Sequence, residues 1–176
     1  SLEGYARAGL NRDGIRIHRP EDFDGMRATG RLAAETLDMI VPFVQVGVST
    51  ERLDQLCHDF MLDHGARPAT LGYKGYPKSS CISINHVVCH GIPSPDKLLR
   101  DGDILNIDVT TILDGWYGDN SRMYVAGHLN RKAERLIEVT HEGLMRGIAA
   151  VKPGNTFGDI GHAIQSHVEA QRMSVV

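Results

Sequence analysis

The chain has 176 residues, of which 41% are hydrophobic and 23% charged, and its formal net charge is −3. This composition is ordinary for a globular protein, and the lack of a basic excess argues against a nucleic-acid surface. No apolar run approaches the roughly 20 residues of a membrane span, and no signal peptide is visible. Cys57, Cys81 and Cys89 form no C-x-x-C motif, which predicts reduced thiols in a cytoplasmic protein.

The first third of the chain predicts an arm and two helices. Residues 1–18 show no hydrophobic period, so we expect an N-terminal arm there and one catalytic domain over residues 19–176. Apolar residues at helical spacing predict a helix over residues 21–44, which Gly47 separates from the next. Ser49 or Thr50 is placed to cap this second helix, over residues 51–64.

The middle and end of the chain predict a sheet and two more helices. A loop rich in Gly, Pro and Tyr, residues 66–80, precedes strand-like residues 81–90. Asp114-Gly115 is a strong turn dipeptide, and it predicts a β-hairpin between residues 103–113 and 116–126. The closing helices are expected over residues 131–151 and 156–171, and the second has the spacing of a capping box.

Residues 44–56 and 151–163 resemble each other at an offset of 107 residues, with Gly47 matching Gly154 and Ser49 matching Thr156. Helix–glycine–cap punctuation is common, so the match has a chance interpretation. If the match reflects a duplication, the second copy stops where its strands are expected.

A two-residue turn at Asp114-Gly115 fixes how the hairpin pairs. Asp119 then faces Thr110 and Asp108 faces Ser121, which puts the two aspartates on one face as diagonal neighbours roughly 7–8 Å apart. The simpler interpretation is a polar face in water. The alternatives are a protonated pair or a divalent metal site, for which two carboxylates are fewer than the usual ligands.

Two further groups are candidates for a site. His86 and His90 are expected to share a face, and His90 is the better candidate because it ends the predicted strand beside Gly91. Tyr73 and Tyr76 have either a turn role or a place in the wall of an apolar pocket.

Four segments together resemble the type I methionine aminopeptidases: GYPKSSCISINHVVCHGIP, LRDGDILNIDVT, DGWYGDNSRMY and VKPGNTFGDIGHAIQ. The resemblance covers residues 20–176. It implies an α+β pita-bread fold, the creatinase/aminopeptidase-like architecture, with a curved antiparallel sheet backed by helices in two pseudo-symmetric halves. The second half is expected to be incomplete in this chain.

The resemblance also implies a reaction, which is the removal of initiator methionine by metal-activated water at two divalent ions (Co, Mn, Fe, Zn or Ni). Asp108 and Asp119 resemble metal ligands, with Asp119 in the bridging position, and His90 resembles the catalytic histidine that contacts substrate. Three residues resemble the methionine pocket: Tyr73, Tyr76 and Cys81. Thr70 stands where related enzymes commonly have cysteine.

The resemblance places the remaining ligands and the general base after residue 176, so we expect the chain alone to be inactive. The implied partners are the N-termini of nascent polypeptides, with the ribosome as one setting. The expected protein is a cytoplasmic monomer without nucleic-acid or membrane binding. Two alternatives stay open, a non-catalytic pita-bread binding protein and a prolidase or aminopeptidase P-type metallopeptidase.

Overall fold

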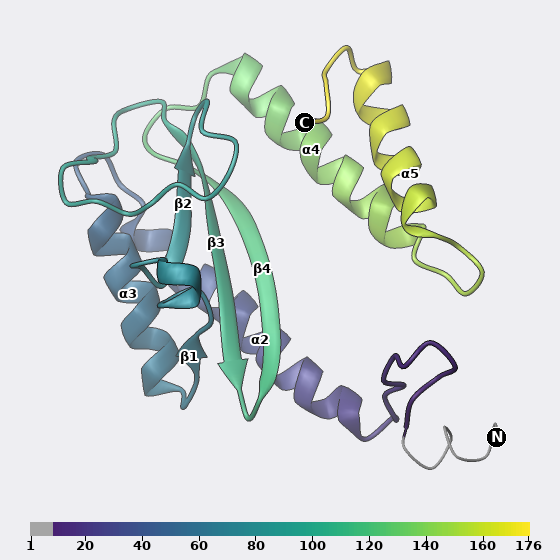
Figure 1. Cartoon of the computed structure of the whole chain (residues 1–176). Coiled ribbons are helices and arrows are strands. Elements are labelled where there is room, and N and C mark those ends of the chain that lie inside the picture. The colour runs from purple at the N-terminus through teal and green to yellow at the C-terminus, as the bar shows by residue number, and fades with distance from the viewer. Residues whose placement is uncertain (1–8) are drawn as a thin grey trace. The chain divides into compact units, whose positions relative to one another are not determined.

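A four-stranded antiparallel sheet organises the first part of the computed structural model, which describes residues 9–176 (Figure 1). The central strand β3, Ile104–Leu113, pairs along its full length with β4, Trp116–Val125. On its other side β3 pairs with β2, Ser80–Ile84, and with the two-residue β1, Arg67–Pro68. The α+β class with an antiparallel sheet and helices is therefore confirmed.

The hairpin has the register predicted from its turn. Asp108 lies opposite Ser121 and Thr110 lies opposite Asp119. Asp114 and Gly115 have φ of 50° and 82°, the left-handed pair of a type I′ turn, whose twist matches that of the strands. The turn chemistry thus places both carboxylates on one face of the sheet.

The two helices predicted in the first third of the chain are confirmed, and the first of them ends earlier than predicted. Helix α3, Thr50–Asp63, begins at Ser49, whose side chain accepts a hydrogen bond from the Arg52 amide. Helix α2 is shorter than predicted and covers Asp22–Met39, followed by the 3₁₀ turn η1, Val41–Phe43. Pro42 in η1 lacks an amide hydrogen and clashes with the preceding turn of an α-helix, so the helix ends before it.

Two loop predictions were wrong in part. The segment 66–80 is a loop that also contains β1 and the 3₁₀ turn η2, Tyr73–Gly75. The strand predicted over residues 81–90 ends at Ile84, because Asn85 adopts a left-handed φ of 51° and turns the chain.

The helices cover one face of the sheet and leave the other for the loop. Figure 1 shows α2 behind β3 and β4, while η2 lies in front of the sheet. Leu105, Ile107 and Val109 point into the core between the sheet and the two helices, where they meet Leu37 and Leu53. Since side chains of a strand alternate, Asp108 and Thr110 point to the opposite face.

The chain forms two units, Ser1–Gly127 and His128–Val176. The second contains α4, Arg131–Ala149, and α5, Phe157–Ala170, with the predicted capping box at Thr156 and Asp159.

The predicted N-terminal arm is described only in part, because residues 1–8 lie outside the described residues. In the rest of the arm, Leu10 and Arg16 pair across a turn. One catalytic domain over 19–176 stays a prediction. Within residues 9–176 no helix is long and apolar enough for a membrane span.

The internal echo has a structural counterpart. Helices α3 and α5 each have 14 residues and begin after a Ser or Thr cap, Ser49 and Thr156. The glycines before the caps, Gly47 and Gly154, have nearly equal left-handed φ of 89° and 91°. The helix–glycine–cap–helix unit therefore occurs twice at the predicted offset.

Candidate metal centre

A cavity of about 570 Å³ opens on the face of the sheet opposite the helices. Its lining combines strands β2, β3 and β4 with the loop around η2 and the segment after β2. All six site residues predicted from the sequence line this cavity: Tyr73, Tyr76, Cys81, His90, Asp108 and Asp119. The tertiary structure thus brings together residues that are spread over 47 positions of the sequence.

The two aspartates form the polar end of the cavity. Asp108 is half-buried and Asp119 is exposed. Burial raises the pKa of the Asp108 carboxyl, the charge of Asp119 and a hydrogen bond with it raise that pKa further, and His90 opposes the shift. Two carboxylates close enough to perturb each other in this way form an arrangement that a divalent cation relieves.

Thr110 holds Asp119 from the neighbouring strand, although it was not among the predicted site residues. Its hydroxyl donates a hydrogen bond of 2.9 Å to Asp119 Oδ1. Thr110 and Asp119 are directly paired in the hairpin, so the predicted register already contained the signal for this contact. The bond leaves the other carboxylate oxygen of Asp119 available to a ligand.

Strand β2 adds Cys81 directly beside Asp108, since the two residues are paired across β2 and β3. Burial raises the pKa of the Cys81 thiol, which a hydrogen bond with Tyr76 opposes. The Tyr76 hydroxyl donates 2.8 Å to the carbonyl of Ser80, and burial raises the pKa of this phenol. Tyr73, by contrast, is 65% exposed at the rim. The lining of the cavity therefore includes aromatic rings and sulfur as well as the carboxylates.

His90 reaches the cavity through a strained backbone. It has a left-handed φ of 54°, which is uncommon for a residue with a side chain. Gly91 next to it pairs with the edge of β2, where its carbonyl accepts 2.8 Å from the Ile82 amide. A Cβ at Gly91 would collide with the Ile82 carbonyl, so only glycine allows this close approach.

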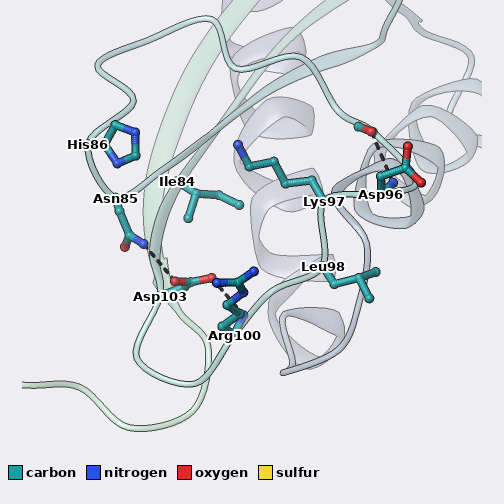
Figure 2. Close-up of a pocket in the computed structure, with 9 residues that line it drawn as sticks. Ile84, Asn85, His86, Asp96, Lys97, Leu98, Arg100 and Asp103 are labelled. Carbon is teal, nitrogen blue, oxygen red and sulfur yellow. Dashed lines mark hydrogen bonds between the residues drawn. The ribbon is translucent and has the colours of Figure 1, made fainter.

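His86 does not share a face with His90, contrary to the prediction, because the segment between them is neither helix nor strand. His86 lines a separate cavity of about 410 Å³, shown in Figure 2. There Lys97 and Arg100 are balanced by Asp96 and Asp103, and Asp103 accepts hydrogen bonds from the Asn85 side chain and the Arg100 amide. The two histidines therefore line different cavities, with the irregular residues 87–89 between them and a left-handed φ of 54° at His90 itself.

The donor set of the first cavity fits a divalent metal in part. Carboxylate oxygens suit Mg, Mn and Zn, and an adjacent imidazole and hydroxyl can orient ligands or substrate. Within residues 9–176, however, no group of three or more His, Cys, Asp or Glu is gathered for a metal ion. Asp108 and Asp119 are two carboxylates, fewer than the roughly three protein ligands of a hydrolytic zinc centre.

The chain is similar to known metallopeptidases in both sequence and structure. The family model described as metallopeptidase family M24 matches residues 24–175. Methionine aminopeptidases of Rickettsia prowazekii and Escherichia coli K12 are 59% and 55% identical over 92% of this chain. The crystal structure of methionine aminopeptidase from Rickettsia prowazekii superposes with a TM-score of 0.90, covering 92% of this chain and 65% of that one. The chain spans about 62% of the length of the curated relatives.

Proposed function

Because this chain belongs to metallopeptidase family M24, we propose that it contributes to a metal-dependent enzyme that removes N-terminal methionine. The observation that carries the proposal is one cavity whose lining combines an aspartate pair with two tyrosines and a buried thiol. The relatives at 55–59% identity are methionine aminopeptidases, which supports this substrate.

In this proposal Asp108 and Asp119 would hold the divalent metal through their carboxylates. The metal, when bound, would supply activated water and polarise the scissile carbonyl. Thr110 keeps the Asp119 carboxylate in orientation by its hydrogen bond of 2.9 Å. Co, Mn, Fe, Zn and Ni are the candidate ions, since carboxylate and imidazole donors accommodate all of them.

The remaining cavity residues bind and orient the peptide. His90 contacts the substrate beside the metal ligands and stabilises the charge that develops on the substrate oxygen. Tyr73, Tyr76 and Cys81 enclose the methionine side chain, whose polarizable thioether makes favourable contacts with aromatic rings and sulfur. The pocket thus selects the side chain while the aspartate end positions the bond.

The partners follow from this substrate. We propose that the enzyme acts on the N-termini of nascent polypeptides, at the ribosome among other places, as a monomer of the cytoplasm. The three cysteines are free in the structure, which agrees with a reducing compartment.

The first experiment titrates the 176-residue chain with Mn²⁺, Co²⁺ and Zn²⁺ by calorimetry and assays it with Met-Ala-x and x-Pro peptides. We expect metal binding that Asp108→Asn and Asp119→Asn each abolish. We expect no methionine release by the chain alone, because two carboxylates are fewer ligands than the roughly three plus water of hydrolytic zinc sites. Full release by this polypeptide would refute that expectation.

The second experiment tests the substrate in a chimera. This chain replaces the matching part of the Rickettsia prowazekii relative, which supplies the rest of the sequence. We expect the chimera to release methionine from Met-Ala-x, and the two aspartate variants to be inactive. A chimera that folds and binds metal but cleaves only x-Pro peptides favours the prolidase alternative. One that folds, binds metal and cleaves neither favours a binding protein.

A further inference from the structure

Helix α3 presents a polar stripe toward the segment that leads into β2, Lys78–Ser80. Glu51, Asp54 and His58 lie on successive turns of one helix face. Glu51 accepts a hydrogen bond of 2.6 Å from Lys78 Nζ, and His58 Nδ1 lies 2.8 Å from Ser79 Oγ. The side chains of Lys78 and Ser79 therefore both contact side chains of helix α3.

Asp54 makes the central contact of this stripe. Its Oδ1 accepts three hydrogen bonds, from the Ser79 amide at 3.0 Å, the Ser80 amide at 2.8 Å and Ser80 Oγ at 2.7 Å. Asp54 is only 6% exposed, so its charge depends on these donors in place of water. Hydrogen bonds to an ionised acceptor are stronger than neutral ones, and three on one oxygen fix the two amides in space.

The carbonyls of the same segment hold the wall of the candidate substrate cavity. Thr70 Oγ1 donates 3.0 Å to the Lys78 carbonyl, and the Tyr76 hydroxyl donates 2.8 Å to the Ser80 carbonyl. Cys81 follows directly in β2. Thr70, Tyr76 and Cys81 all line the cavity, so its wall is attached to peptide groups that Asp54 holds from the other side.

We propose that Asp54 is a positioning residue that sets the shape of the side-chain pocket without touching the ligand. The carboxylate fixes the Lys78–Ser80 peptide groups, and these fix Tyr76 and Thr70 in the wall of the cavity. The identity of the ligand rests on the proposed function, whereas the coupling from Asp54 to Tyr76 does not.

The test compares three variants of the 176-residue chain. Asp54→Ala removes all three hydrogen bonds. Asp54→Asn keeps a carbonyl oxygen that can accept from the same donors, so it serves as the conservative rescue. Asp63→Ala is the matched control, because Asp63 is an exposed aspartate of the same helix. Cooperative thermal unfolding establishes that each variant is folded.

The first readout is the NMR signals of Tyr76, Thr70 and Cys81, without any ligand. We expect Asp54→Ala to shift all three, Asp54→Asn to shift them much less, and Asp63→Ala to leave them in place. A folded Asp54→Ala whose three signals match the original chain overturns the proposal. If Asp54→Ala does not fold, Ser80→Ala removes one of the three bonds, and unchanged Tyr76 signals in that variant overturn it equally.

The second readout is the preference for methionine amide over alanine amide, measured by NMR titration. We expect this preference to fall by at least about tenfold in Asp54→Ala, to be restored in Asp54→Asn and to stay in Asp63→Ala, since pockets discriminate side chains by such factors. An unchanged preference in folded Asp54→Ala overturns the pocket role. If the original chain shows no preference, the proposed substrate fails, and the Tyr76 signals still decide the role of Asp54.

Discussion

Asp108 is half-buried beside a second carboxylate, and this environment has a thermodynamic consequence. Burial and Asp119 raise the pKa of Asp108, so the folded chain holds a proton there at pH values where the unfolded chain has lost it. Stability without metal therefore falls as the pH rises above about 4 toward the raised pKa. In the proposed function a bound metal would reverse the balance, because the ionised pair is the form that would hold a cation.

Asp108→Asn removes this penalty. In the presence of a chelator at pH 7, we expect the variant to melt above the original chain, by about 2–4 °C for each kcal/mol of repulsion relieved. The difference should vanish below pH 4, where both chains are neutral at this position. With excess divalent metal the original chain should melt higher. Thermal melts over pH 3–8, with chelator and with metal, measure these three differences in melting temperature. If Asp108→Asn melts below the original chain with chelator at pH 7, the predicted direction of the effect is wrong.

Thr110 offers a second test at the level of a single side chain. Thr110→Val keeps the shape and removes the hydroxyl that holds Asp119. We expect metal affinity to fall about 10–100-fold, as for other groups that orient metal ligands. Thr110→Ser keeps the hydroxyl and is the control. Calorimetric titration with Mn²⁺ compares them, and equal affinities of all three chains would show that the hydrogen bond has no part in binding.

At the scale of elements, the contact between α2 and β4 depends on the absence of one side chain. A Cβ at Gly118 in β4 would collide with the carbonyl of Thr29, so the helix backbone lies directly on the strand. Thr29 also exchanges hydrogen bonds with Thr111 of the neighbouring strand β3, and their hydroxyl oxygens lie 2.8 Å apart. The close approach of the two backbones and the buried hydroxyl pair both fix the position of α2 on the hairpin that contains Asp119.

Gly118→Ala should therefore move α2 off the hairpin. We expect a loss of about 1–3 kcal/mol in the free energy of unfolding, measured by urea denaturation. Gly30→Ala is the matched control in α2, where an added Cβ meets no atom within 4 Å. There we expect a gain of up to about 1 kcal/mol, because alanine favours the helix. Equal effects of the two substitutions would exclude the close approach as their cause.

At the scale of the whole molecule, the candidate site and the main core belong to one unit. Every residue of the buried core cluster lies between Leu32 and Ala126, and the six predicted site residues lie within the same range. The second unit contains α4 and α5. The proposed metal site therefore consists of residues of the first unit.

A shortened chain tests this division. We expect residues 1–127 expressed alone to fold cooperatively and to bind Mn²⁺ within about threefold of the 176-residue chain, a difference below 1 kcal/mol. Circular dichroism and calorimetric titration provide the two measurements. A folded 1–127 chain with no metal affinity, beside a 176-residue chain that binds, would show that the second unit takes part in the site.

Local chemistry was sufficient for much of the structure. The Asp114-Gly115 turn determined the hairpin register, because two left-handed residues permit only one pairing, and that register predicted Asp108 and Asp119 on one face. Ser49 and Thr156 likewise determined where α3 and α5 begin, because a cap bonds to an amide three residues away. The hairpin register and the starts of the two helices depend on residues close together in the sequence, so they can be predicted from it.

Only the tertiary structure decided how distant segments meet. The irregular segment between His86 and His90 places them in different cavities, and the pairing of β2 with β3 sets Cys81 beside Asp108. The bonds from Asp54 to Ser79 and Ser80 join residues 25 and 26 positions apart. No local pattern encodes such contacts, because they arise from packing α3 and the sheet around one core. By itself the sequence therefore determined the carboxylate pair, and the fold decided which side chains surround it.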